Sequence, residues 1–155
     1  MTKWMFCLII VACGSMSLQA KEPEIIEALE EYYLFAPPGG GSIGYKQIPV
    51  EERSQILFVD TRTRQEYQAA HIPGAMHLEW REVVERREEL PQERPIILYC
   101  NSGASSAQSM MGLHLVGMDN VRTLAGGFIR YLETRADGGR SGRDAMIDQA
   151  ELSND

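Results

Sequence analysis

Residues 95–108, PIILYCNSGASSAQ, run from a short apolar stretch into a cysteine, a loop of small residues and a segment with helical character. The apolar residues predict a buried strand over Ile96–Tyr99, and the segment from Ser105 to Val116 predicts a helix. Cys100 then lies at the end of the strand and faces the N-terminus of the helix. There, the helix dipole and the free backbone N–H groups favour a thiolate over a thiol. The stretch therefore predicts a sulfur nucleophile that needs no neighbouring base.

Short apolar runs alternate with amphipathic segments on both sides of this stretch. The predicted strands are Ile56–Val59, which ends at Asp60, Ala75–Leu78, Ile96–Tyr99 and Val121–Leu124. The predicted helices are residues 63–70, Trp80–Leu90, Ser105–Val116 and Phe128–Arg135. This alternation indicates an α/β fold with a parallel sheet whose two faces are covered by helices. Ligands of such sheets bind beyond the carboxyl ends of the strands, where Cys100 is expected.

The segments at the two ends of the chain differ from the alternating centre. Residues 22–35 carry apolar residues at helical spacing with acids between them, which predicts a helix that the run PPGGGS over residues 37–42 terminates. Residues 137–155 are polar and predict a loose tail. We therefore divide the chain into a signal over 1–20, a helical arm with a linker over 21–44, one domain over 45–136 and a tail over 137–155.

The first 20 residues have the pattern of an export signal. Lys3 gives a positive start, the apolar run Trp4–Ala12 is too short to span a bilayer, and Ser17–Ala20 resembles a cleavage site. We therefore expect a periplasmic or secreted protein without a membrane span. An alternative stays open, because Ile10–Cys13 resembles the lipobox of a bacterial lipoprotein, in which Cys13 would carry a lipid anchor.

Net charge and cysteine content exclude some classes of function. The chain has 155 residues, enough for one hydrophobic core, and a formal net charge of −7, which disfavours nucleic-acid binding. Cleavage after Ala20 removes Cys7 and Cys13 and leaves Cys100 as the one cysteine of the mature chain. Exported proteins usually pair their cysteines, so a single one indicates a reactive thiol or a disulfide to another chain. With one cysteine, no spacing indicates a zinc site, and we expect neither a metal nor a cofactor.

Three segments in this order resemble the rhodanese domain, a sulfurtransferase fold. The family pattern D-x-R…E-[FY]…G-H-I-x-G-A is similar to Asp60-Thr61-Arg62, Glu66-Tyr67 and His71-Ile72-Pro73-Gly74-Ala75, with Ala70 at the place of the usual glycine. The loop after Cys100 is the second segment, and Leu124-Ala125-Gly126-Gly127-Phe128 resembles the Gly-Gly motif that opens the last helix. The match covers about residues 45–135. Chain length, export signal and the Tyr-Cys-Asn-x-Gly start further resemble the small single-domain periplasmic rhodaneses of the phage-shock type.

The resemblance implies a single rhodanese-like domain with a parallel sheet of about five strands, and a ping-pong reaction at Cys100. The thiolate takes a sulfane sulfur from a small donor, thiosulfate or a persulfide, and the resulting persulfide passes it to cyanide or a thiol acceptor. Small residues let backbone N–H groups converge on the anionic sulfur. The loop residues expected to bind the substrate in this way are Asn101, Ser102, Gly103, Ala104, Ser105 and Ser106. A hydroxyl of Ser105 or Ser106 is also placed to cap the helix.

The loop lacks the cation that many rhodaneses carry there. Asn101, Ala104 and Ser105 occupy the positions concerned, and the sequence does not place Arg62, Arg122 or Arg130 relative to the loop. A cation would help to bind a dianion and lower the thiol pKa, so its absence points from thiosulfate toward a persulfide donor. A second hypothesis therefore stays open, a catalytically weak or inactive module that binds a protein partner or a sulfur ligand.

A phosphatase of the same fold is disfavoured by the same loop. Such enzymes need an arginine six residues after the cysteine to grip the phosphate, and Ser106 holds that position.

The polar residues of the first motif have several expected roles. Asp60, at a strand end, is placed to orient the active-site loop, to pair with a cation or to cap the next segment. Arg62 is expected to form an ion pair with Glu66 or to help orient the loop. The histidines are expected in structural positions rather than catalytic ones; they are His71, His77 and His114.

Overall fold

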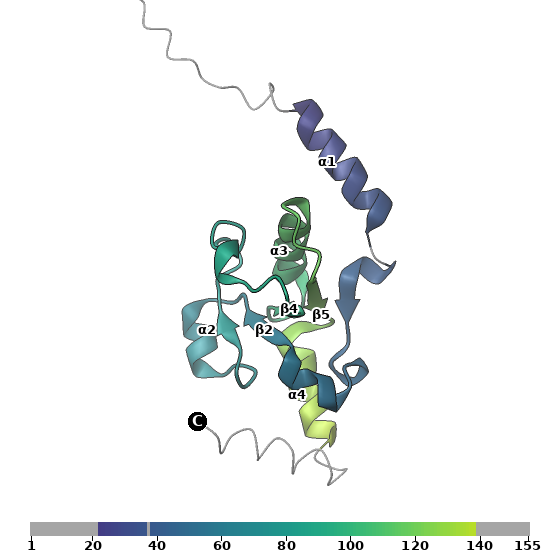
Figure 1. Ribbon diagram of the computed structural model, residues 1–155. Helices are drawn as coiled ribbons and strands as arrows, with labels where there is room; N and C mark the ends of the chain where they lie inside the picture. Colours follow the sequence, from purple (N-terminus) through teal and green to yellow (C-terminus); the bar gives the residue numbers. More distant parts are fainter. Residues whose placement is uncertain (1–21, 37, 139–155) are drawn as a thin grey trace, which may run out of the picture.

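The computed structural model describes residues 22–36 and 38–138, which Figure 1 shows as a sheet with helices around it. The predicted export signal and most of the predicted tail lie outside these residues. The helices are α1 (Glu22–Phe35), α2 (Arg64–Ala69), α3 (Ala104–Leu115) and α4 (Gly127–Gly138). The strands are β1 (Ser42–Ile43), β2 (Leu57–Asp60), β3 (Met76–His77), β4 (Ile96–Tyr99) and β5 (Val121–Leu124). Four short 3-10 helices cover Pro38–Gly41, Tyr45–Gln47, Val50–Gln55 and Arg87–Glu89.

The five strands form one sheet in the order β1-β5-β4-β2-β3, and every pair of neighbours is parallel. The predicted parallel α/β fold is therefore confirmed. In the register of the two central strands, Leu57 lies opposite Ile96 and Asp60 lies opposite Tyr99. Because parallel strands end at the same edge of a sheet, Asp60 and the residue after Tyr99 are brought side by side. That residue is Cys100.

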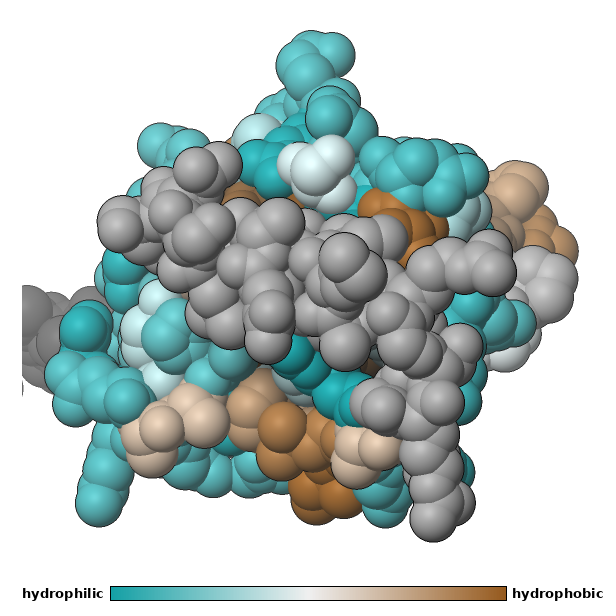
Figure 2. Space-filling view, turned by 90° about the horizontal axis from the view of Figure 1, so that it is seen from below, coloured by the Kyte–Doolittle hydropathy of each residue, from teal (hydrophilic) through white to brown (hydrophobic). Residues whose placement is uncertain are grey.

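The central strand β4 faces a helix on each side, because its side chains alternate between the two faces of the sheet. Ile96 and Leu98 pack in a core cluster with Met110 and Leu113 of α3. Ile97 and Tyr99 pack in a second cluster with Phe128 and Tyr131 of α4. All eight side chains are at most 6% exposed, and burial stabilises each by about 1.5–3 kcal/mol. Where the described residues are visible from below, hydrophilic residues predominate at the upper and left margins and apolar ones gather at the lower edge (Figure 2).

Two elements differ from the sequence-based prediction. The first is β1, which falls inside the segment expected to be a linker and pairs Ser42 with Thr123 of β5. With two residues, this strand is too short to show an alternating pattern of its own. Its backbone pairing with a buried neighbour, and not its composition, makes it a strand.

The second difference concerns residues 80–90, where the predicted helix is wrong. Residues 80–86 form successive turns, and a short 3-10 helix over Arg87–Glu89 follows. The backbone is held from outside the segment, since the N–H of Trp80 donates to the carbonyl of Thr61 at 3.0 Å. Val83 and Leu90 are both buried in the core. These tertiary contacts override the helical propensity of the charged residues between them.

The helix α1 covers the residues that the periodicity predicts, and it lies at the margin of the domain beside α3 (Figure 1). None of its residues is buried, and the exposed fractions of Ile25, Ile26 and Tyr33 are 46%, 48% and 69%. Within the residues that the structure describes, no helix is long and apolar enough to cross a membrane.

Candidate active site

Cys100 directly follows β4 and is buried, with 5% of its surface exposed. The backbone N–H of Gly103 donates to its Sγ at 3.1 Å, and the hydroxyl Oγ of Ser106 lies 3.7 Å from the same sulfur. Gly103 adopts a φ of +101°, in the left-handed region that glycine enters without a steric cost. This conformation turns the loop back so that its N–H points at the sulfur. The predicted setting of the cysteine, between a strand end and a helix start, is thereby confirmed.

The start of α3 corrects one detail of the prediction. The helix begins at Ala104, its N-cap is Gly103, and no side chain caps it. The expected cap by Ser105 or Ser106 is therefore wrong. Both serines lie inside the first helical turn, where the Ser106 hydroxyl donates to the Gly103 carbonyl at 3.1 Å and also faces the sulfur. Because glycine makes the turn, neither serine hydroxyl is needed as a cap, and the Ser106 hydroxyl is shared between the Gly103 carbonyl and the sulfur.

The groups around the sulfur favour its ionised form. Burial alone raises the pKa of the Cys100 thiol, but hydrogen bonds from the Ser105 hydroxyl, from the Ser106 backbone and hydroxyl and from the Ser102 backbone lower it to about 7. At neutral pH a larger share of the cysteine is therefore thiolate than at the ordinary pKa of a free thiol. Of the six loop residues expected to bind the substrate, Gly103 and Ser106 lie within hydrogen-bond distance of the sulfur, and Ser102 and Ser105 contribute to its lowered pKa. Ala104 is the first residue of α3. Asn101 turns its side chain elsewhere.

The N-terminus of α4 holds the loop from the other side. The N–H of Phe128 donates to the carbonyl of Cys100 at 2.8 Å, and the N–H of Ile129 donates to the carbonyl of Asn101 at 3.2 Å. A Cβ at Gly127 would overlap the Cys100 carbonyl and lie 2.7 Å from the carbonyl oxygen of Asn101. The second glycine of the Gly-Gly motif is thus required for the close approach of α4 to the loop.

Arg62 pairs with Asp60, and the expected ion pair with Glu66 is wrong. The Nη2 of Arg62 lies 2.6 Å from a carboxylate oxygen of Asp60 and donates to the carbonyl of Ala70 at the same distance. Both partners are buried, with exposed fractions of 7% for Arg62 and 0% for Asp60. Burial disfavours the cation, but the hydrogen bonds and charge of Asp60 outweigh it and raise the pKa of Arg62 above its ordinary value.

Asn101 connects the loop to α2 and to this ion pair. Its Nδ2 donates to Oε1 of Glu66 at 2.6 Å, and its Oδ1 accepts from Nη1 of Arg62 at 3.5 Å. Glu66 also accepts from the N–H and the hydroxyl of Thr63, at 3.1 and 2.6 Å. The hydrogen bonds from Thr63 and from Asn101 lower the pKa of Glu66. Glu66 thus stays a carboxylate beside the loop, a role that the sequence did not predict although the residue lies in the E-[FY] motif.

The three histidines lie in structural positions, as expected. A ring nitrogen of each is within hydrogen-bond distance of a backbone carbonyl, which can only accept; the pairs are His71 with Tyr67 at 2.8 Å, His77 with Arg62 at 2.9 Å and His114 with Val121 at 2.9 Å. Among residues 22–36 and 38–138, no three side chains of His, Cys, Asp and Glu come together as a metal site requires.

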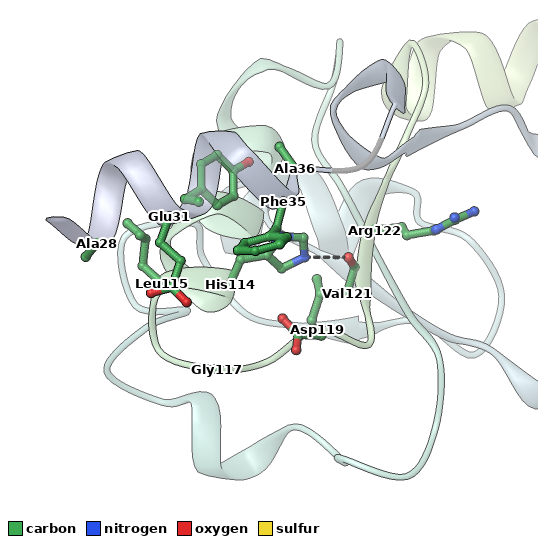
Figure 3. Close-up of a pocket in the computed structure, with 11 residues that line it drawn as sticks. Ala28, Glu31, Phe35, Ala36, His114, Leu115, Gly117, Asp119, Val121 and Arg122 are labelled. Atoms are coloured by element: carbon green, nitrogen blue, oxygen red, sulfur yellow. Dashed lines mark hydrogen bonds between the residues drawn. The ribbon is translucent and has the colours of Figure 1, made fainter. Parts of the chain in front are cut away.

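The other two arginines considered for the loop take different positions. Arg130 lies in the first turn of α4 with its side chain beside Gly126, and it pairs with Glu133 at 3.1 Å. Arg122 lies at the start of β5 and lines a pocket of about 660 Å³ between α1 and the end of α3 (Figure 3). His114 lies in the same pocket and donates to the carbonyl of Val121. Because this pocket is at the amino ends of the strands, it lies at the opposite edge of the sheet from Cys100.

Comparisons with known proteins agree with the fold and with the three motifs. The profile described as the Rhodanese-like domain matches residues 46–134, more than half of the chain. A protein of Allochromatium vinosum named sulfurtransferase is 35% identical over 80 residues, which cover 52% of this chain and 75% of that protein. The thiosulfate sulfurtransferase GlpE of Coxiella burnetii is 32% identical over 90 residues, which cover 54% of this chain and 84% of that protein.

Among solved structures, the human single-domain sulfurtransferase TSTD1 superposes with a TM-score of 0.52 and 20% identity, over 61% of this chain and 97% of the human protein. A rhodanese-related protein of Thermoplasma volcanium gives a TM-score of 0.51 and 21% identity, over 54% and 83%. At these identities the likeness shows the fold alone.

Proposed function

Because the chain belongs to the rhodanese-like domain family, we propose that it is a sulfurtransferase that carries a sulfane sulfur as a persulfide on Cys100. The donor is thiosulfate or a persulfide, and the acceptor is cyanide or a thiol. One observation carries this proposal: the buried Cys100 sulfur receives backbone N–H and hydroxyl groups that lower its pKa to about 7. The names of the relatives from Allochromatium vinosum and Coxiella burnetii support the reaction class.

The proposed reaction has two steps at one sulfur atom. The Cys100 thiolate attacks the outer sulfur of thiosulfate, an S–S bond to the cysteine forms, the donor S–S bond breaks, and sulfite leaves with the bonding electron pair. The terminal persulfide sulfur carries the negative charge, and the donors around Cys100 stabilise it as they stabilise the thiolate. A cyanide ion or a thiolate then attacks this terminal sulfur, and the Cys100 thiolate is released again.

The intact mass of the protein after incubation with donor tests the proposal. We expect wild-type protein to gain one sulfur atom, located by peptide mapping at Cys100, and to lose it on addition of cyanide with release of thiocyanate. The Cys100→Ala variant is expected to show neither change. Because Cys7 and Cys13 are present in the full chain, the mapping also serves as the internal control. If no donor places a sulfur on Cys100, or if Cys100→Ala turns over like wild type, the proposal is wrong.

The alternative is a non-catalytic module that binds a partner or a sulfur ligand. The loop from Asn101 to Ser106, which carries no cation, is the observation in its favour. A binding module has no need for an ionised sulfur, so the lowered pKa of Cys100 favours catalysis. Steady-state thiocyanate formation at rates ordinary for rhodaneses would leave the alternative without support.

We also propose that the protein is exported, on the sequence of residues 1–20. Signal-peptidase cleavage gives a mature protein that begins at Lys21, whereas lipoprotein processing gives one that begins at a lipidated Cys13. The N-terminal peptide of protein isolated from the periplasmic and membrane fractions of an expressing bacterium distinguishes the two. Protein that retains Met1 and stays in the cytoplasm would contradict both.

A further inference from the structure

The charges that contact the Cys100 loop do not cancel. Asp60 and Arg62 form a closed, buried ion pair whose net charge is zero. Within the part of the chain that the structure describes, Glu66 forms no ion pair; it accepts hydrogen bonds from the neutral groups of Thr63 and Asn101, and Arg62 acts on it through a smaller Coulomb attraction. One negative charge therefore remains beside the residue that directly follows the nucleophile.

The orientation of the Asn101 amide fixes this charge in place. The amide lies between a guanidinium and a carboxylate, so its oxygen must face Arg62 and its NH₂ must face Glu66. The 2.6 Å contact is short, as is usual when the acceptor is ionised. Asn101 itself is exposed at the loop. A donor that approaches Cys100 over this side of the loop therefore meets a carboxylate at a fixed position, and the loop from Asn101 to Ser106 carries no cation to offset it.

We propose that Glu66, held beside the Cys100 loop by Asn101, is a specificity-determining residue that disfavours doubly charged sulfur donors and so selects donors with a single negative charge. This inference rests on the proposed sulfurtransferase function and names the donor class for it. A monoanionic sulfane donor is an organic persulfide or a thiosulfonate. Coulomb repulsion is proportional to the donor charge, so the repulsive free energy for a dianion such as thiosulfate is twice that for a monoanion.

Two donors that differ in charge but deliver the same sulfur atom test the inference. Thiosulfate carries two charges and leaves as sulfite, whereas the methanethiosulfonate anion carries one charge and leaves as methanesulfinate. In both cases Cys100 thiolate attacks the outer sulfur, the donor S–S bond breaks, and the total charge is conserved. The measured quantity is the second-order rate constant, kcat/KM, for each donor with cyanide as acceptor, in wild type and in Glu66→Gln.

The expected result is unequal for the two donors. Removal of one negative charge near the loop should raise kcat/KM for methanethiosulfonate by roughly two- to five-fold and for thiosulfate by about the square of that factor. The ratio of the two rate constants is the decisive number. It is independent of the fraction of protein that folds, because both donors are assayed on the same preparation. Glu66→Ala should shift this ratio in the same direction.

Two further variants separate the charge of Glu66 from other effects. Asn101→Ala removes the hydrogen bond that holds the carboxylate but keeps its charge, so it should shift the ratio in the same direction as Glu66→Gln, and by less. Glu52→Gln makes the same change of net charge at residue 52, which lines a groove with Pro95 and Ile96 at the opposite end of β4. It should leave the ratio at its wild-type value.

The inference and the proposed function can fail separately. If wild type forms the Cys100 persulfide but Glu66→Gln leaves the ratio unchanged, or shifts it no more than Glu52→Gln does, the inference is wrong and the function stands. If neither donor places a sulfur on wild-type Cys100, the proposed function itself is wrong.

Discussion

At the scale of single residues, the site ionises a buried cysteine without a side-chain base or a cation in its loop. Burial raises the pKa of the Cys100 thiol, and the hydrogen-bond donors around the sulfur lower it by more. Each of these donors is a backbone N–H or a serine hydroxyl at the start of α3. The sulfur is therefore activated by the position of the loop, which the strand and two helices determine.

The pH dependence of Cys100 alkylation should show this activation. With a pKa of about 7 in place of 9, the rate of modification by iodoacetamide should rise with pH to a midpoint near 7, because only the thiolate reacts. Ser105→Ala removes a hydroxyl that favours the thiolate, so its midpoint should lie at higher pH. The rate is followed on the Cys100 peptide by mass spectrometry.

Ser102→Ala is the matched control for this experiment. Ser102 lowers the thiol pKa through its backbone N–H, which the variant retains, so the midpoint should stay at the wild-type value. Equal shifts in both serine variants, or a wild-type midpoint at the ordinary value of a free cysteine, would contradict the hydrogen-bond origin of the shift.

Sequence reasoning predicted the setting of Cys100 correctly but assigned the wrong partner to Arg62. Arg62 and Glu66 are four residues apart, which is the spacing of an ion pair on one helix face. The helix α2, however, begins only at Arg64 with Thr63 as its N-cap. Arg62 thus lies outside the helix, and Glu66 turns back to Thr63 in a capping box. The predicted helix over residues 63–70 already excluded Arg62, so the error came from spacing alone: Arg62 precedes the helix and its guanidinium turns back to Asp60.

At the scale of elements, the loop is held between two helix N-termini. The first turn of α3 presents donors to the sulfur, and the first turn of α4 binds the carbonyls of Cys100 and Asn101. Because the two helix starts lie so close to the loop, both motifs have room only for small residues. Their types were predictable from the sequence, since glycine and serine pairs before a helix are typical of anion-binding turns.

The crowding predicts a large cost for Gly127→Ala. Gly127 has a φ of +59°, which disfavours alanine, and the added Cβ would in addition collide with the backbone of Cys100 and Asn101. We expect Gly127→Ala to lower the free energy of unfolding by ~1–3 kcal/mol more than a substitution that only strains φ. The reason is that the backbone atoms around the added Cβ cannot easily move away. Chemical denaturation measures the difference.

Gly117→Ala supplies that comparison. Gly117 has a φ of +85°, but a Cβ there meets no atom within 4 Å. It should therefore show the conformational cost without the collision and should keep the wild-type alkylation rate of Cys100. If both glycine variants are destabilised equally, the close contact of Gly127 with the backbone of the Cys100 loop does not contribute as described.

At the scale of the whole molecule, the parallel sheet assembles a site from segments far apart in the sequence. Asp60, Cys100 and Gly127 come from three successive strand ends, and each motif follows a different strand. The regular alternation of apolar runs made this arrangement predictable. Residues 80–90 and β1 were not predictable, because contacts with other elements determine their backbone: Trp80 bonds to Thr61, and Ser42 pairs with Thr123.

The helix α1 is expected to contribute little to the stability of this assembly. No residue of α1 is buried, and its ring contact with the domain, Tyr32 with His114, has a centroid separation of 6.0 Å. Since hydrophobic stabilisation is proportional to the apolar area removed from water, a helix that stays exposed adds little. A chain that begins at residue 38 should therefore unfold at nearly the same denaturant concentration as one that begins at residue 22.

Leu98→Ala sets the scale for that measurement. Leu98 is 0% exposed in the centre of the sheet, and truncation of such a core leucine costs about 2–5 kcal/mol. A loss of this size on removal of α1 would show that α1 belongs to the folding core. A small loss together with unchanged persulfide formation at Cys100 would place α1 outside both the core and the catalytic machinery. The stability of the site would then reside in the sheet, α3 and α4, which are the elements that position the cysteine.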